Sequence, residues 1–268
     1  KVIDEILTDL SKNIPMNRLL QGDVGSGKTV VSAIASFVSI LNGFQVVLMA
    51  PTQILANQHY ETINNLFKDL KIRVSLITGQ KIVKDIGRVD VFIGTHALLN
   101  KAKLFEKVGL IIIDEQHKFG VKQAEILTKS AKKISPHILT MTATPIPRTI
   151  AQTMFSDMDL SILNEIPIGR IPIKTWLVPN TKRSNAYDWC KLQILNSKCQ
   201  MFVICPPIEE SEVETLKSIK SVKKEFLILK SHFSNLRLGL LHGKLKENEK
   251  IQVLNDFKTG KTNILVST

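Results

Sequence analysis

Long apolar runs are missing from this sequence of 268 residues. The longest apolar stretch, residues 30–41, is interrupted by three serines and falls short of the roughly 20 residues that cross a bilayer. We interpret it as a buried helix and expect no membrane partner. The chain also begins without Met and without the basic and apolar regions of a secretory signal, which we interpret as the mark of a fragment.

Cysteine is scarce as well. Cys190, Cys199 and Cys205 are the three present, and no two of them form a Cys-x-x-Cys pair. An odd number at these spacings does not fit a disulfide framework and favours a reducing compartment, so we expect a cytoplasmic protein.

Arginine contributes only seven of the 36 basic residues, yet the net charge is +12. Lysines and arginines that neutralise phosphates release condensed counterions, so this excess favours a polyanionic partner such as nucleic acid. A general compositional preference for lysine would produce the same excess, and charge alone leaves both explanations open.

Short apolar segments alternate with amphipathic ones along the first part of the chain. Apolar strands separated by helices predict an open α/β domain whose parallel sheet is covered on both faces, with ligands at the carboxyl ends of the strands. The segments that we interpret as strands are residues 46–50, 74–78, 91–94, 110–113 and 138–142.

The pattern breaks between residues 157 and 172, where Pro167, Gly169 and Pro172 cluster, and we interpret this segment as an interdomain connection. We therefore expect two domains, residues 1–168 and 169–268. In the second, we expect strands at 201–205, 238–241 and 264–267, helical segments around Lys217 and Lys223, and a helix at 247–257. The final run stops within an element, so we expect this second domain to be incomplete.

A glycine-rich segment, Gly22-Asp-Val-Gly-Ser-Gly-Lys-Thr29, matches the phosphate-binding loop pattern. A short strand, 18–21, precedes it and a helix from about Lys28 follows, so backbone N–H groups and the helix dipole would converge on phosphates. Lys28 would reach the β- and γ-phosphates and Thr29 would ligate Mg²⁺. A glycine-rich turn without nucleotide is the alternative. The predicted nucleotide-binding residues are Gly22, Gly25, Ser26, Gly27, Lys28 and Thr29.

Two carboxylates, Asp114 and Glu115, end an apolar strand. Burying such charges is costly unless a cation or a donor compensates them, and a metal ion would do so. We predict that Asp114 holds Mg²⁺ through water and that Glu115 orients and polarises the attacking water. Two acids after a strand are otherwise an ordinary solvated turn, and their pairing with the phosphate loop favours the catalytic role.

Further polar residues follow other predicted strands. His117, close to Glu115, and Thr142 and Thr144, after the next strand, predict a relay between hydrolysis and movement. Pro51-Thr52 and Thr95-His96 follow two more strands and offer amides and hydroxyls of the kind that grip a phosphate backbone. Taken singly, both are plain strand-to-helix turns.

Together these segments resemble the ordered motifs of superfamily 2 helicases, and among them the RecG type. The resemblance covers essentially the whole chain, and it is strongest in the phrases MTATPIPRT and IIIDEQHKFGV. The transcription-repair coupling translocases are less similar, because they typically carry DEEH and a different residue after the second glycine of the loop. The matching segments are GDVGSGKT, MAPTQILANQHY, GTHALL, IIIDEQHKFGV, MTATPIPRT, ICPPIEES, LLHGKL and NILVST.

The resemblance implies two RecA-like P-loop domains with parallel sheets, with ATP and Mg²⁺ as cofactors. It implies a monomeric bacterial DNA helicase at the nucleoid that reverses stalled forks and migrates Holliday junctions in repair and recombination. Gln116 would join the nucleotide-site residues. The first-domain DNA contacts would be Pro51, Thr52, Thr95 and His96, and the second-domain motifs include His242, Gly243, Ser267 and Thr268.

The sequence departs from the family pattern at several places. Lys118 stands where the family usually has Arg, and the segment between Gly79 and Val91 is shorter than is typical. The wedge domain that reads the junction and the glutamine that recognises adenine would precede Lys1. The arginine-bearing motif of the second domain would follow Thr268.

Two other functions are alternatives to an ATP-driven motor. A nucleotide-dependent clamp that binds DNA without turnover is one, and we expect this shortened chain itself to behave so. A P-loop kinase or transporter ATPase is disfavoured, since neither explains MTATPIPRT or a second α/β unit.

Overall fold

The computed structural model describes residues 1–78, 89–115, 135–144, 158–165, 171, 173–205 and 212–268, and within 102–104, 212–221 and 247 it describes the backbone alone. The chain divides into two compact units, Lys1–Ile171 and Pro172–Thr268. None of the described helices is both long enough and apolar enough to cross a membrane.

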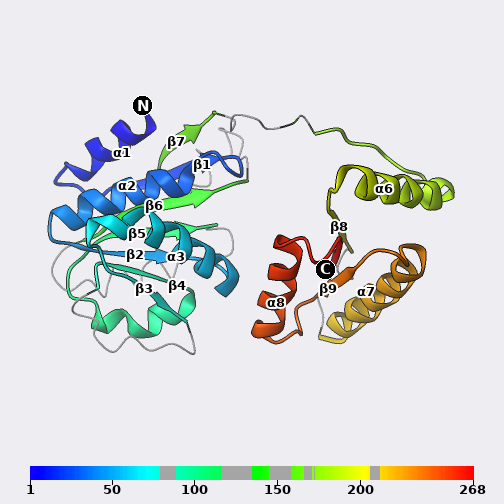
Figure 1. Ribbon diagram of the computed structural model, residues 1–268. Coiled ribbons are helices and arrows are strands. Elements are labelled where there is room, and N and C mark those ends of the chain that lie inside the picture. Colours follow the sequence, from blue (N-terminus) through cyan, green and yellow to red (C-terminus); the bar gives the residue numbers. More distant parts are fainter. Residues whose placement is uncertain (79–88, 116–134, 145–157, 166–170, 172, 206–211) are drawn as a thin grey trace. The chain divides into compact units, whose positions relative to one another are not determined.

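The first unit contains a seven-stranded sheet in the order β3-β4-β2-β5-β6-β1-β7 (Figure 1). All of its strand pairs are parallel, which confirms the predicted α/β class. Each predicted strand is present, with ends that differ by at most two residues. The strands are β1 (Asn17–Gly22), β2 (Gln45–Met49), β3 (Val74–Ile77), β4 (Val91–Gly94), β5 (Val108–Asp114), β6 (His137–Thr142) and β7 (Asp159–Leu163).

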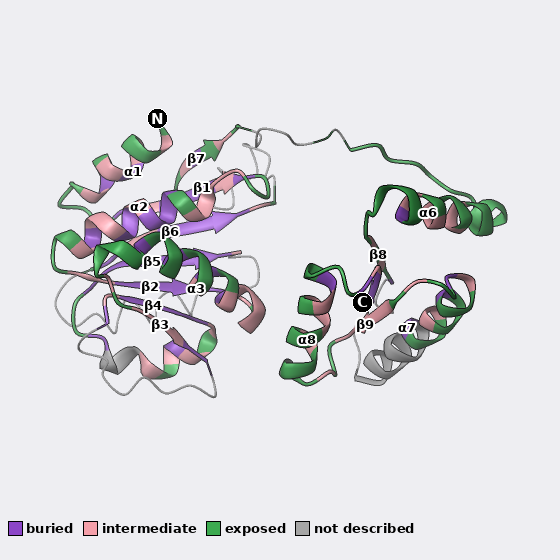
Figure 2. Cartoon of the chain, viewed as in Figure 1, coloured by how far each residue is buried: buried purple, intermediate pink, exposed green. Residues whose placement is uncertain are grey.

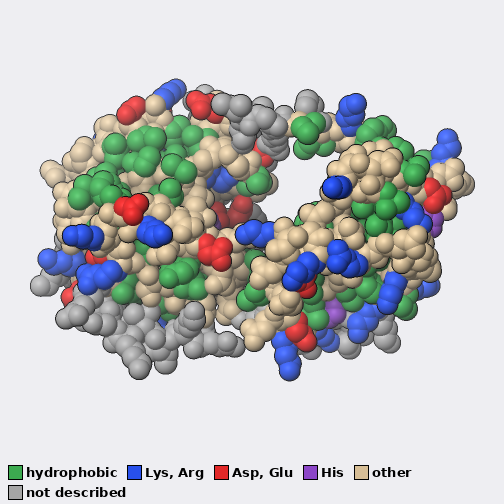
Figure 3. Space-filling model, viewed as in Figure 1, with side chains coloured by type: hydrophobic (Ala, Val, Ile, Leu, Met, Phe, Trp, Pro, Cys, Tyr) green, Lys and Arg blue, Asp and Glu red, His purple; other side chains and the backbone are tan. Residues whose placement is uncertain are grey.

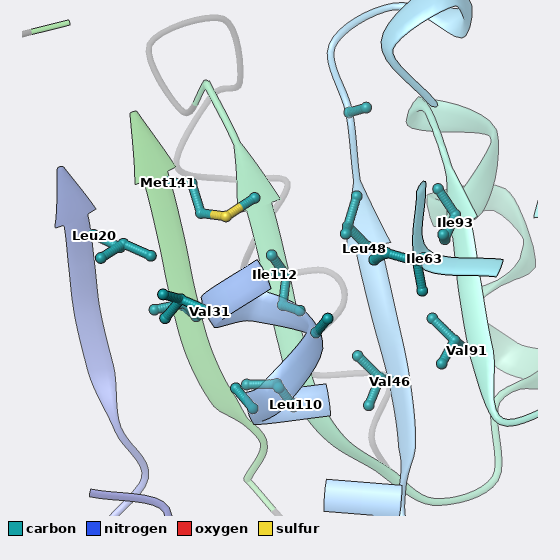
Figure 4. Packing of buried hydrophobic residues seen from close by; sticks show 14 of the residues in the cluster. Leu20, Val31, Val46, Leu48, Ile63, Val91, Ile93, Leu110, Ile112 and Met141 are labelled. Atoms are coloured by element: carbon teal, nitrogen blue, oxygen red, sulfur yellow. The ribbon is translucent and has the colours of Figure 1, made fainter. Parts of the chain in front are cut away.

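Both faces of this sheet are buried. Successive residues of a strand point to opposite faces, and alternate residues of the central strands belong to two different hydrophobic clusters. Val46 and Leu48 pack on one face with Val31 and Ile63 from two helices (Figure 4), whereas Val47 lies in the cluster on the other face. The first face is covered by α1 (Val2–Leu10), α2 (Lys28–Leu41) and α3 (Gln53–Phe67), and the second is packed against residues of the 3₁₀ segment η3 (His96–Leu104).

The prediction that residues 157–172 form an interdomain connection is partly wrong. Asp159–Leu163 forms the edge strand β7, which pairs with β1 so that Arg18 lies opposite Asp159. Its central residue, Ser161, is buried although polar, because its hydroxyl accepts a hydrogen bond of 2.8 Å from Arg18 Nη1. A polar residue at the buried position removed the apolar alternation by which a strand is recognised.

An ion-pair network fixes α1 to this sheet. Arg18, on β1, donates from Nε to Asp9 Oδ2 at 2.7 Å, and Lys12 Nζ donates to Asp9 Oδ1 at 2.7 Å. Both Asp9 and Arg18 are buried. Burial opposes the ionisation of Asp9, but the hydrogen bonds from Lys12 and Arg18 and their charges hold its pKa below the usual value.

The second unit contains a three-stranded parallel sheet in the order β8-β10-β9. Its core includes Val222, Phe233 and Ile264, while Phe202 and Ile204 of β8 are exposed. Most of helix α6 (Arg183–Ser197) is exposed, as its largely green ribbon in Figure 2 shows. The helical segments predicted around Lys217 and Lys223 are one helix, α7. The elements are η5 (Asn180–Lys182), α6 (Arg183–Ser197), β8 (Met201–Ile204), α7 (Glu212–His232), β9 (Leu238–Leu241), α8 (Glu247–Lys258) and β10 (Ile264–Ser267), and in the first unit η1 (Lys68–Leu70) follows α3.

Candidate functional site

Most of the predicted site residues of the first unit lie along one edge of its sheet. Gly22, Asp114 and Thr142 are the last residues of β1, β5 and β6, which are neighbours. Strands β2 and β4 are also neighbours, and they end at Met49, which Ala50 separates from Pro51-Thr52, and at Gly94, directly before Thr95-His96. Because β5 pairs with β2, the strand ends beside the predicted nucleotide-binding residues adjoin those beside the predicted DNA-contacting residues.

The phosphate loop has the backbone conformation that its glycines permit. Gly25 and Gly27 have φ of 80° and 93°, in the region that side chains disfavour. Gly27 is the N-cap of α2, so the first N–H groups of a 14-residue helix open onto the loop. A Cβ atom on Gly22 would overlap Ser26 Oγ and lie 3.0 Å from Leu163 Cβ, so a larger residue there would force the Ser26 side chain to move.

Lys28, the first residue of α2, turns back into the loop. Its Nζ donates hydrogen bonds to the carbonyl oxygens of Gly22 at 2.7 Å and Asp23 at 2.9 Å. Burial lowers the pKa of its ammonium group, whereas the charges of Asp114, Glu115 and Asp23 oppose that shift. The ammonium group is therefore within electrostatic range of the carboxylates of Asp114 and Glu115.

One further feature of the loop fits a phosphate ligand. Within the part of the chain that the structure describes, Ser26 Oγ is buried and has no hydrogen-bond partner. Buried hydroxyls are normally satisfied, so an unpaired one beside Lys28 fits a ligand with acceptor oxygens.

Glu115 is held against the end of the neighbouring strand. Its backbone N–H donates to Met141 O at 2.9 Å, and its Oε1 accepts from the N–H of Ala143 at 3.3 Å. Its φ of 53° is left-handed, which costs free energy in a residue with a side chain and is common at functional sites. The structure thus brings together Glu115 and the segment that contains Thr142 and Thr144, whose hydroxyls are 3.3 Å apart.

The residues present fit a magnesium site that is completed by nucleotide. Among the described residues, no group of three or more His, Cys, Asp or Glu side chains is arranged to hold a metal ion. Mg²⁺ usually binds through one or two carboxylates together with substrate phosphates and water, which matches Asp114 beside a phosphate loop that contains Thr29. Gln116 and His117 lie outside the described residues.

The predicted DNA-contacting turns are side by side in the first unit. Thr52 is exposed and caps α3, because its side chain accepts a hydrogen bond of 3.2 Å from the N–H of Leu55. Thr95 is half-buried and His96 is exposed at the end of the paired strand β4. Ala50, just before Pro51, donates to Gly94 O at 2.8 Å and joins the two turns.

The corresponding residues of the second unit also meet at strand ends. His242 and Gly243 follow β9, Ser267 is the last residue of the adjacent strand β10, and Thr268 follows it. Lys250 Nζ donates to Gly243 O at 2.9 Å, which places a cation at this edge. On the visible face in Figure 3, Lys and Arg side chains are scattered over this unit rather than gathered in one patch.

His59 was not predicted as a site residue, although it lies in the segment MAPTQILANQHY. This residue of α3 is buried, and its Nε2 lies 2.7 Å from Asp114 Oδ2. The available signal was its spacing, since Ala56, His59 and Ile63 share the buried stripe of the helix and a polar residue in such a stripe needs a partner.

Comparison with known families matches both units. The DEAD/DEAH box helicase family matches residues 1–153, and the helicase conserved C-terminal domain matches residues 189–268. The ATP-dependent DNA helicase RecG of Streptococcus pneumoniae is 46% identical over all of this chain and 40% of its own length. That of Escherichia coli strain K12 is 40% identical, again over all of this chain and 40% of its own length.

Solved structures show the same fold. A RecG bound to a three-way DNA junction aligns with a TM-score of 0.76 at 36% identity, over 99% of this chain and 35% of that one. Dbp5 of Saccharomyces cerevisiae bound to RNA and ADP BeF3 aligns with a TM-score of 0.71 at 20% identity, over 100% of this chain and 69% of that one. The predicted pair of RecA-like α/β domains is confirmed, and the chain spans about two fifths or less of the RecG proteins compared.

Proposed function

Because this chain belongs to the DEAD/DEAH box helicase family, we propose that it is the ATP-driven motor of a DNA helicase that remodels branched DNA. The proposed outcomes are fork reversal and Holliday junction migration in repair and recombination. Identity of 46% to a RecG over the whole chain and the likeness to a RecG bound to a three-way junction support this substrate class. We assign the ATP-binding domain to residues 1–168 and the second domain to residues 169–268.

Before the chemical step, the bound nucleotide would be held mainly by the phosphate loop. Lys28 and the N–H groups at the start of α2 would hold the β- and γ-phosphates, with Ser26 Oγ as a further donor. Thr29 and Asp114 would hold Mg²⁺, which when bound neutralises charge on the phosphates. Lys28 Nζ donates to the carbonyl oxygens of Gly22 and Asp23, and on nucleotide binding it would exchange at least part of these contacts for phosphate oxygens.

The proposed chemical step uses Glu115. Its carboxylate orients a water molecule and accepts its proton while the water oxygen bonds to the γ-phosphorus. The bond from that phosphorus to the β–γ bridging oxygen breaks, and the electron pair leaves with ADP. The contact between Glu115 Oε1 and Ala143 N links this step to the Thr142–Thr144 segment, which we propose passes it to DNA movement.

One observation carries the proposal. Lys28 begins α2 after the loop that follows β1, and its Nζ turns back onto Gly22 O at 2.7 Å, within range of the charges of Asp114 and Glu115 at the end of β5. Such convergence of a loop lysine with two carboxylates is what phosphoryl transfer from ATP requires and what a structural turn does not.

The experiment that tests the function uses the complete protein that contains this chain. It should convert a fork or three-way junction into separated products with ATP, and a linear duplex of equal length should be a much poorer substrate. Equal action on both DNAs would argue against the branched-DNA assignment, and no action on either would argue against a helicase.

A further inference from the structure

His59 and Asp114 form a buried polar pair that the proposed mechanism does not use. Both residues are 8% exposed, and the Nε2 to Oδ2 distance is 2.7 Å. A buried carboxylate that loses its donor carries a large desolvation cost, and a charge-assisted bond of this length fixes the orientation of the acceptor. The bond uses one carboxylate oxygen of Asp114 and thereby sets where the other oxygen points.

The pair also links the predicted nucleotide-binding residues to the predicted DNA-contacting turn at the carboxyl ends of the strands. His59 lies six residues into α3, which begins after Thr52 in the predicted DNA-contacting turn. At 1.5 Å per residue, about two turns of helix separate that turn from the histidine. Asp114 ends β5, the strand that pairs with β2 beneath the same turn.

We propose that His59 is a positioning residue for the magnesium ligand Asp114, an inference that rests on the proposed function. The Nε2–H donates to Asp114 Oδ2 and holds the carboxylate in the orientation that Mg²⁺ and nucleotide need. Hydrogen-bonded partners of metal-ligating groups typically contribute about 10- to 100-fold to metal affinity or activity. The effect of His59 should therefore appear only when Mg²⁺ is present.

The test is the affinity for a fluorescent, non-hydrolysable ATP analogue, measured with saturating Mg²⁺ and again with EDTA. The ratio of the two dissociation constants isolates the contribution of the metal. Glutamine places an amide nitrogen near the position of Nε2, whereas asparagine is one methylene shorter, so His59→Gln and His59→Asn form a matched polar pair. We expect His59→Gln to keep most of the ratio and His59→Asn to lower it about tenfold or more, with unchanged affinity in EDTA.

A second histidine provides the control for general loss of stability. His137 accepts a hydrogen bond of 2.9 Å from the N–H of Met16, at the opposite end of β6 from Thr142. We expect His137→Asn to leave the ratio unchanged. Each variant is first checked for folding by circular dichroism. If His59→Asn does not fold, His59→Met, which removes the donor without adding a polar group, takes its place.

The possible outcomes separate this inference from the proposed function. Wild-type affinity that rises with Mg²⁺, together with an unchanged ratio in the folded His59→Asn or His59→Met variant, overturns the role of His59 alone. A parallel loss in Mg²⁺ and EDTA also overturns it, because His59 then supports the fold or loop and not the metal ligand. Absence of nucleotide binding by the wild type overturns the proposed function and this inference with it.

Discussion

The N–H of Ala143 donates a hydrogen bond of 3.3 Å to Glu115 Oε1, which ties the end of β6 to the proposed water-activating carboxylate at the end of β5. The backbone N–H of Glu115 donates in turn to Met141 O at 2.9 Å. Glu115 is thus held by its main chain and its side chain to one neighbouring segment. A displacement of Glu115 at the reacting phosphate would therefore also displace the segment that contains Thr142 and Thr144.

The first prediction concerns Glu115→Gln, which keeps the size of the side chain but cannot accept the proton of the attacking water. We expect ATP turnover to fall by about 10² to 10⁴-fold, whereas nucleotide affinity changes little because Lys28 and the loop remain. Steady-state ATPase activity and analogue binding, measured on the same preparation, check the two expectations. Turnover within a fewfold of wild type would remove Glu115 from the mechanism.

The second prediction concerns stability in acid. The pKa of Asp9 is lowered in the folded state, so its ion pairs stabilise fully above its usual pKa and are lost as pH falls below about 4. We expect Arg18→Met to cost about 3 kcal/mol at neutral pH, because it breaks a buried ion pair and leaves Lys12 to compensate the charge of Asp9. The cost should shrink toward pH 3 in urea unfolding experiments. A cost that is independent of pH would show that packing, not charge, makes Arg18 matter.

The third prediction concerns the cap of α3. Thr52→Ala removes the side-chain acceptor for the N–H of Leu55 and should cost about 1 kcal/mol of stability, whereas Thr52→Ser should cost little. If the same turn contacts DNA, Thr52→Ala should also weaken DNA binding, and Thr52→Ser should not. Thermal unfolding and fluorescence anisotropy with labelled DNA measure the two effects separately, and normal DNA affinity in both variants would exclude this hydroxyl as a contact.

The fourth prediction concerns the net charge of +12. If DNA is held mainly through its phosphates, the logarithm of affinity should fall linearly with the logarithm of salt concentration, with a slope near −0.9 for each neutralised phosphate on duplex DNA. Scrambling the base sequence should change affinity little. A flat salt dependence, or strong preference for one base sequence, would contradict a grip on the backbone.

The parts of the fold and site that were predictable are those that short sequence segments determine. The phosphate loop and its φ-permissive glycines are contained in eight consecutive residues, and the apolar stretch that follows predicts the helix α2. The acids Asp114 and Glu115 mark the end of an apolar strand, and the carboxyl ends of parallel strands share one edge of the sheet. Their placement at that edge therefore followed from the pattern, while their catalytic roles stay predictions.

The features that were missed depend on distant residues. His59 and Asp114 are 55 positions apart, and their contact requires the rotation of α3 about its axis, which the hydrophobic stripe specifies only coarsely. Strand β7 was hidden because Ser161 occupies its buried position through a hydrogen bond with Arg18, 143 residues away. Both cases involve a buried polar residue whose partner the local pattern cannot reveal.

The most direct measurement for the central claim is nucleotide binding by Lys28→Ala, compared with Lys68→Ala, which removes an exposed lysine of η1. Lys28 Nζ lies within the phosphate loop, 2.7 Å from Gly22 O, so its loss should abolish measurable affinity for a fluorescent ATP analogue, and the Lys68 variant should bind as wild type does. Unchanged affinity in a folded Lys28→Ala protein would contradict the assignment of the nucleotide site and the ATP-driven motor built on it.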